Sequence, residues 1–285
     1  MINVPVTIVC PTHKGSKKLP KLLKSIFSNK VIPNEIIICG TSKNDFKYIK
    51  KKKNIKLLIS SVASQSYQRN LAVKESKNQI IIQCDDDLIL DKNFVNKMYE
   101  HFKNSKNEKK IVSASILTSN NFHQSIRWNR LFRNNLVFKS IIFFLNKLKK
   151  PKNMSIISSG RIAPLLPKKF LKKKDKSLKP LENNEWLCST ICFNKRYYSN
   201  NYSKTKVKKS FYEDVIFTHS LYKKKFNLIL DPNIIAYHPI KKKSDIVSFW
   251  KTIPVHFEIV RKFNKSYFMF FIDIFLFSII YIFSK

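Results

Sequence analysis

The chain has 285 residues, 44% of them hydrophobic, which is enough for one large or two modest domains with a sizeable core. Its 55 Lys and Arg residues against 18 Asp and Glu give a formal charge of +37. With only 3 Gly residues, it has no Gly-x-Gly-x-x-Gly or Gly-x-x-x-x-Gly-Lys loop, which excludes the two standard glycine-rich phosphate cradles.

The charge excess indicates a polyanionic partner, which is a nucleic acid, an anionic membrane surface or a phosphate-rich substrate. Part of it can also reflect a chain rich in Lys, Asn and Ile together. The five cysteines form no Cys-x-x-Cys pair and are expected to be buried free thiols in a reducing compartment. The N-terminus has no basic region before a long apolar run, so no cleaved signal peptide is expected.

The first hundred residues alternate between strand and helix patterns. Strands are predicted at Val6–Cys10, Glu35–Cys39, Ile55–Ser60 and Ile80–Gln83. Helices are predicted at Leu19–Phe27, Tyr67–Ser76 and Phe94–Phe102. Continuous apolar strands separated by helices predict a parallel sheet that is covered on both faces. Ligands of such sheets bind beyond the carboxyl ends of the strands.

Three polar segments follow strands and are therefore expected at that one edge: Pro11-Thr12, 40–42 and the run Asp85-Asp86-Asp87. Adjacent carboxylates repel one another, and a bound cation removes the repulsion. Oxygen ligands suit Mg²⁺ or Mn²⁺, which often bridge to phosphates. The triple Asp run thus indicates a metal-dependent enzyme with a phosphorylated donor. The alternative is a solvated acidic turn.

Two segments of the second half have membrane-like patterns. Trp128–Lys149 mixes basic and apolar residues, as expected for a basic helix lying on a membrane or for a buried helix with a solvated basic face. Tyr267–Phe283 is apolar except for Asp273. It is expected to span the membrane or to lie in its interface, and the alternative is a buried core helix. Deleting the residues after Lys265 is expected to leave the rest folded.

Five motifs in order along the chain carry a family resemblance. They are Ser64–Ala72, Asp85–Asp87, Glu185–Ser189, Phe211–Val215 and Asn227–His238. Over about residues 4–240 the chain resembles the inverting glycosyltransferase family 2 enzymes, which have a GT-A fold. The resemblance implies an α/β fold in which a Rossmann-like mixed sheet is flanked by helices.

The same resemblance implies a domain division. Residues 1–240 are expected to form the GT-A domain, with a nucleotide-sugar half at 1–100 and an acceptor half at 101–240. Residues 241–285 are expected to form a helical segment that associates with a membrane.

The resemblance also assigns donor and metal residues. Pro11, Thr12, Arg69, Asp85 and Asp86 are expected on the donor, with Arg69 facing the diphosphate and Asp86 chiefly supporting its loop. The metal ligands are expected to be Asp87 and Asp85, with His238 completing the shell as a neutral imidazole. A surface histidine is the alternative for His238.

On the acceptor side, Asp214 is the expected general base, and Glu213 beside it is the second catalytic candidate. The pair also fits a helix N-terminus, where carboxylates are favoured. Trp186 is expected either to stack on the acceptor sugar or to fill the core. A single displacement with a base inverts the anomeric centre without a covalent sugar intermediate.

The implied function is metal-dependent transfer of a sugar from a nucleotide-diphosphate donor, a UDP-sugar first, to a glycan or lipid-linked acceptor. The expected place is the cytoplasmic face of the cell membrane, in cell-surface polysaccharide synthesis. The alternatives are a basic nucleic-acid-binding protein, for which no motif is present, or a nucleotidyltransferase using the same Asp-metal site.

Two positions depart from the family pattern. Cys39-Gly40-Thr41 stands where family members carry an Asp against the nucleotide base. Cys188-Ser189-Thr190 replaces the usual small Gly on the acceptor side.

Overall fold

The computed structural model describes residues 2–13, 17–50, 52–104, 108–118, 123, 125–171, 178–188, 190–198, 212–238 and 250–283. Of the motif residues above, Ser189 and Phe211 lie outside this part, as do residues 172–177 of the predicted Lys-rich loop 168–179.

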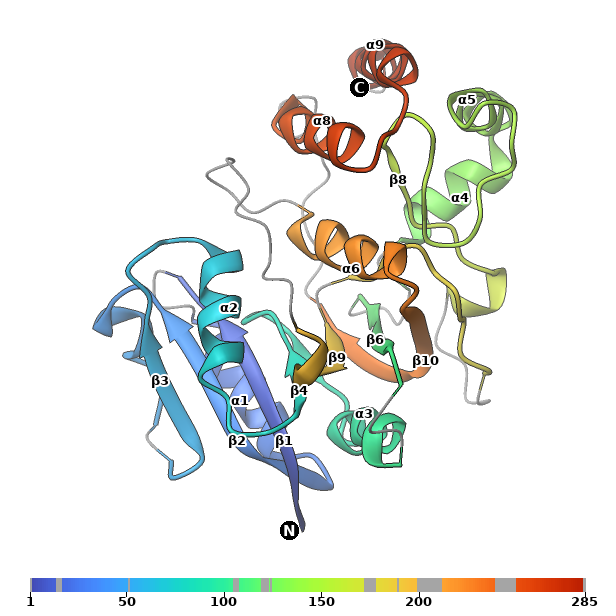
Figure 1. Ribbon diagram of the computed structural model, residues 1–285. Helices are drawn as coiled ribbons and strands as arrows, with labels where there is room; N and C mark the ends of the chain where they lie inside the picture. The colour runs from blue at the N-terminus through green and yellow to red at the C-terminus, as the bar shows by residue number, and fades with distance from the viewer. Residues whose placement is uncertain are drawn as a thin grey trace.

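The centre of the molecule is one eight-stranded mixed sheet (Figure 1). Its strands are β1 (Ile2–Pro11), β2 (Val31–Gly40), β3 (Ile55–Ile59), β4 (Ile80–Gln83), β5 (Ile89–Leu90), β6 (Lys110–Leu117), β9 (Ile191–Asn194) and β10 (Asn227–Tyr237). They are ordered β3-β2-β1-β4-β9-β6-β10-β5, and β9 and β5 run antiparallel to their neighbours. β7 (Ser155–Ile156) and β8 (Ile162–Ala163) form a separate hairpin.

Helices cover both faces of this sheet, and others pack outside it. They are α1 (Leu19–Phe27), α2 (Gln65–Lys74), α3 (Phe94–Lys103), α4 (Ile126–Asn134), α5 (Leu136–Leu145), α6 (Glu213–Lys223), α8 (Ile253–Lys262) and α9 (Tyr267–Phe283). Short 3₁₀ turns lie at η1 (Lys43–Phe46), η2 (Lys168–Phe170) and η3 (Lys195–Tyr197). Each strand and helix predicted in the first hundred residues is confirmed, with bounds that shift by a few residues.

Two hydrophobic clusters sandwich the sheet, because successive side chains of a strand point to opposite faces. On β2, Ile36 and Ile38 pack into the cluster beneath α1 and α3. Ile37, between them, packs into the cluster beneath α2, α6 and α8. The continuous apolar strands thus bury both faces, as the sequence predicted. All five cysteines are buried and free.

A third, smaller cluster joins α5 to α9. Phe138, Ile142 and Leu145 of α5 pack with Phe277 of α9 and with the chain around Ile157. The predicted segment Trp128–Lys149 is not one helix. It breaks at Asn135, whose backbone is extended and whose side chain accepts a hydrogen bond from the amide of Phe138 (2.8 Å), so that α5 starts anew.

Asp273 of α9 is buried against the body of the protein. Its carboxylate accepts hydrogen bonds from Arg161 Nε (2.8 and 3.0 Å), from Arg161 Nη2 and from the Ser159 hydroxyl (2.6 Å). The Arg161 guanidinium also lies 3.4 Å from the centroid of the Phe277 ring. Within the described ranges, none of the helices combines the length and the apolar character needed to cross a membrane.

Candidate active site

The ends of β1 and β2 are tied together at the carboxyl edge of the sheet. The amide of Thr12 donates to the carbonyl of Cys39 (2.9 Å). The Gln68 side chain, from α2, donates to the carbonyls of Thr12 (2.7 Å) and Cys39 (2.8 Å). The sequence did not predict a role for Gln68, although this residue immediately precedes Arg69 in the motif Ser64–Ala72. Its buried amide fixes the loop that holds Pro11 and Thr12.

The Asp run follows β4 at the same edge, and its members have different partners. Asp86 accepts a hydrogen bond from the Thr12 hydroxyl (2.7 Å), so it joins its loop to the end of β1. Asp87 Oδ1 lies 3.2 Å from His238 Nε2, and Asp87 Oδ2 lies 3.2 Å from Lys18 Nζ. His238 follows β10, so residues more than 150 positions apart in the sequence meet here.

The pKa of Asp87 falls to about 2. Burial raises this pKa, but the hydrogen bonds and positive charges of His238 and Lys18 outweigh burial. Asp87 is therefore a carboxylate at neutral pH. Lys18 was not singled out from the sequence, since nothing distinguishes it there from the many other lysines.

The donor set at Asp87 fits a divalent cation in part. A carboxylate oxygen and an imidazole nitrogen converge there, and both bind divalent metal ions in proteins, the carboxylate being the type that suits Mg²⁺ and Mn²⁺. The predicted third ligand, Asp85, is not with them, because its carboxylate is bonded to Arg69. Among the described residues, no three or more His, Cys, Asp or Glu side chains form a group that could hold a metal ion. The Asp87–His238 pair would therefore hold a cation only together with ligands from outside the protein.

Arg69 joins the loop after β4 to the start of α6. Its guanidinium is 1% exposed, with Nη2 2.7 Å from Asp85 Oδ1 and Nη1 2.6 Å from Glu213 Oε1. The sequence placed Arg69 against the diphosphate. In the structure it is instead a buried bridge, because two carboxylates from distant segments compensate its charge where water is excluded.

Asp214 lies at the start of α6, beside the Arg69 bridge to the loop after β4. Glu213, next to it, is buried in the Arg69 bridge, whereas Asp214 is partly exposed. The residue before them, Tyr212, has a left-handed backbone (φ +57°), which turns the chain sharply into the helix. Burial, followed by the charge of Glu213 and then that of Asp85, raises the pKa of Asp214 to about 7 against the opposing effect of Arg69.

Of the two roles that the sequence allowed for Trp186, sugar stacking or core packing, the structure shows core packing. It is 6% exposed, packs in the cluster beneath α6 and donates its indole N–H to the carbonyl of Ser155 (3.2 Å). A ring this buried has no open face for a sugar. Trp186 thus contributes to the structure by packing in the core.

The departure at Gly40 has a steric reason. A Cβ on Gly40 would lie 2.8 Å from the Cβ of Asp45 and 2.9 Å from the Phe46 ring. Asp45 is fixed there because its carboxylate accepts from the amide (2.6 Å) and hydroxyl (2.9 Å) of Thr41 and from the amide of Ser42 (3.1 Å). The turn after β2 consequently has no room for a side chain at position 40.

The sequence of residues 7–165 matches the family model of glycosyl transferase family 2, which is more than half of the chain. The chain belongs to glycosyl transferase family 2. No curated protein matches the sequence.

Solved structures of GT-A glycosyltransferases share the fold of this family 2 protein. It is similar to S. aureus TarS 1–349, at 12% identity and a TM-score of 0.53 over 90% of this chain and 65% of that chain. It is also similar to the same fragment in complex with UDP-GlcNAc, at 12% identity and a TM-score of 0.52, over 90% of this chain and 66% of that chain. GalNAc-T7 with UDP, GalNAc and Mn²⁺ gives 13% identity and a TM-score of 0.61, over 90% of this chain and 47% of that chain. The chain therefore spans less than two thirds of these structures, and at such identity they show the GT-A fold alone.

Proposed function

We propose that this family 2 protein transfers a sugar from a nucleotide-diphosphate donor to an acceptor hydroxyl with inversion, using a divalent cation. One observation carries the proposal, namely the Arg69 bridge. It joins Asp85, in the acidic loop after β4, to Glu213, next to the partly exposed carboxylate of Asp214. A donor site and a base are thereby held at one edge of the sheet, where ligands of such sheets bind.

The proposed base is Asp214. The acceptor oxygen forms its bond to the anomeric carbon while Asp214 accepts the proton from that hydroxyl. The bond from the anomeric carbon to the diphosphate breaks at the same time, and its electron pair leaves on the phosphate oxygen. Direct displacement inverts the anomeric centre. The pKa of about 7 suits this role, because a base with a pKa near the working pH accepts a proton readily.

The proposed cation holders are Asp87 and His238, 3.2 Å apart. A bound Mn²⁺ or Mg²⁺ would supply a positive charge to neutralise the leaving diphosphate. Asp87 contributes a full negative charge to that site at neutral pH. The Thr12–Asp86 hydrogen bond keeps the acidic loop against β1, so the ends of both strands present one surface to the donor.

UDP-sugars are the proposed donors, supported by the UDP complexes of the similar TarS and GalNAc-T7 structures. The proposed acceptor is a glycan or a lipid-linked glycan used in cell-surface polysaccharide synthesis. A nucleic-acid-binding role has no counterpart in the family match, and a nucleotidyltransferase is disfavoured because the chain belongs to a glycosyltransferase family.

Asp87→Asn is expected to weaken Mn²⁺-dependent UDP binding by more than about tenfold, because the amide keeps the volume but removes the charge that holds the cation. The measurement is calorimetric titration of UDP with and without Mn²⁺. Asp91→Asn is the matched control, since it removes the same charge four residues further on, after β5, and should bind like the wild type. Equal UDP affinity with Mn²⁺ and with a chelator in the wild type would remove the cation from the proposal.

A further inference from the structure

The outer face of α9 is apolar and exposed. Phe268, Phe271, Phe275 and Ile279 recur every three or four residues and therefore share one side of the helix. Their exposed fractions are 68%, 61%, 65% and 37%. A run of large exposed apolar side chains on one helix face is typical of an interaction surface.

The opposite side of α9 is attached to the protein. Phe270, Asp273 and Phe277, again at helical spacing, are each 3–4% exposed. Asp273 is bonded to the buried Arg161, and Phe277 meets Phe138 of α5 edge-to-face at 6.0 Å between ring centroids. A helix crossing a bilayer would have to withdraw this carboxylate from its guanidinium. The pair instead holds α9 along the surface of the body.

α5 packs beside α9 and also has an exposed apolar side. α5 and α9 lie in contact at the end of the molecule far from the N-terminus, where α8 also lies (Figure 1). On its outer side α5 exposes Leu136 (76%), Val137 (69%), Phe143 (41%) and Phe144 (42%). We name the outer sides of α5 and α9 together the α5/α9 surface. It combines two apolar helix faces that are far apart in sequence.

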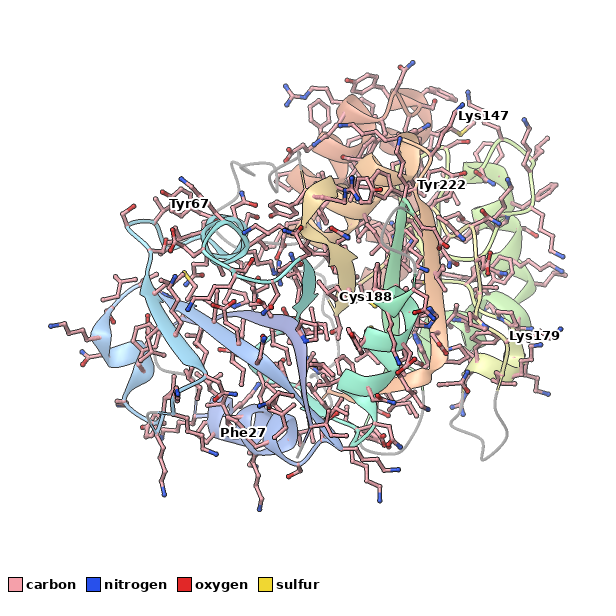
Figure 2. The ribbon with its side chains drawn as sticks, turned by 60° about the horizontal axis from the view of Figure 1, so that its bottom comes forward. Phe27, Tyr67, Lys147, Lys179, Cys188 and Tyr222 are labelled. Carbon is pink, nitrogen blue, oxygen red and sulfur yellow. The ribbon has the colours of Figure 1, made fainter. Side chains whose placement is uncertain are left out.

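Positive charge borders the α5/α9 surface. A cavity of about 1200 Å³ lies between α4, α5 and the chain after α5, and none of its lining residues is a candidate active-site residue. Its basic lining residues are Arg130, Arg133, Lys139, Lys150, Lys168 and Lys169, and none of its described lining residues is acidic. Lys139 shares a helix face with Phe143, four residues on. Figure 2 labels Lys147, just after α5, at the outer edge of the molecule.

We propose that the α5/α9 surface docks on an anionic phospholipid membrane, with α9 lying in the plane of the interface and the basic cavity facing the lipid phosphates. Aromatic side chains are favoured at the level of the lipid headgroups, and basic residues beside them are attracted to anionic lipids. The apolar helix faces complement the acyl-chain region of such a membrane, and the cavity lined by basic residues complements its phosphate headgroups. Of the three possibilities for Tyr267–Phe283, this proposal chooses the interfacial helix over the membrane span and the buried core helix.

The first test is co-sedimentation with vesicles of phosphatidylcholine alone or with equal parts of phosphatidylglycerol. Changing Phe268, Phe271 and Phe275 together to Ser should weaken binding to the anionic vesicles by about tenfold or more. The matched control changes Ile2, Tyr48 and Ile59 to Ser, which are similarly exposed apolar residues at the other end of the fold, and should bind within about twofold of the wild type. All six side chains are exposed, so both variants should fold, and circular dichroism checks this.

The charge is tested separately with Lys139→Glu/Lys150→Glu, against the control Lys53→Glu/Lys77→Glu, which changes the net charge equally. Only the first should lose the preference for anionic vesicles. Equal losses in both would mean that the overall charge, and not this surface, attracts the membrane. If vesicles are not bound and light scattering shows a dimer that the triple Phe variant abolishes, the partner is a second copy and the proposal is wrong.

The orientation is tested with single cysteines at Phe268, Phe275 and Ile279, each labelled with a fluorophore, because the five native cysteines are buried. Quenching by spin-labelled lipids should give all three positions the same shallow depth. A depth that changes steadily along α9 would show insertion across the bilayer and would overturn the in-plane arrangement. None of these readouts depends on sugar transfer, so they test the membrane proposal independently of the proposed enzymatic function.

Discussion

Asp214→Asn is expected to lower the rate of sugar transfer by about 10²- to 10⁴-fold and to leave donor affinity nearly unchanged. The amide keeps the size of the carboxylate and cannot accept the proton of the acceptor hydroxyl. Donor binding should persist, because the donor is assigned to the ends of β1 and β2 and to the loop after β4. The measurement is transfer rate beside UDP-sugar affinity for the same protein preparation.

Glu213→Gln is the matched comparison, one residue away. Glu213 is 5% exposed and paired with Arg69, so this variant should lower the unfolding free energy by about 1–3 kcal/mol while transferring sugar much faster than Asp214→Asn. An Asp214→Asn protein with near wild-type transfer beside an inactive, stable Glu213→Gln protein would reverse the two roles.

The same carboxylate predicts a pH dependence. The pKa of Asp214 is raised to about 7, first by burial and then by the charges of Glu213 and Asp85, with Arg69 opposing them. Only the deprotonated form can act as a base, so the transfer rate should rise as the pH passes through about 7 and level off above it. A rate that is flat from pH 5 to pH 9 would argue against Asp214 as the base.

Asp273→Ala is expected to lower the unfolding free energy by about 3–5 kcal/mol, because it leaves the buried Arg161 guanidinium without its carboxylate. Urea denaturation measures the loss. The control is Glu75→Ala, which breaks a solvent-exposed pair with Lys56 and should change stability little. Arg161→Met/Asp273→Leu should recover most of the loss, since it removes both charges. An Asp273→Ala protein as stable as the wild type would show that the Asp273–Arg161 pair does not stabilise the fold.

The same contact bears on the truncation after Lys265. The sequence alone predicts that the rest of the chain stays folded, and we expect a loss of stability as well. The structure places the Asp273 carboxylate against Arg161, so the deletion would strand a buried charge and expose the third hydrophobic cluster on α5.

The sheet edge was predictable because it depends on local signals. Continuous apolar strands and the polar residues after them were enough to place Thr12 and Asp86 together, and the structure puts them 2.7 Å apart. The triple Asp run stood out because its charges repel. Its positions at the end of β4 follow directly from where the apolar run stops.

The partners of each side chain were not predictable in the same way. Arg69 was expected on the donor, but its role depends on Glu213, 144 positions away, and no local pattern encodes that contact. Trp186 and Asp273 are similar cases, because whether an aromatic ring or a single carboxylate is buried is decided by distant segments that pack against it. Lys18 carried no distinguishing signal in a chain with 55 Lys and Arg residues.

The most direct test of the proposed function is nucleotide release from a panel of sugar nucleotides by the purified protein. At least one UDP-sugar should be cleaved with Mn²⁺ or Mg²⁺ present, and both a chelator and Asp87→Asn should abolish the cleavage. Failure to bind or cleave any sugar nucleotide with either cation, by a protein shown to be folded, would contradict the assignment of this site to metal-dependent glycosyl transfer.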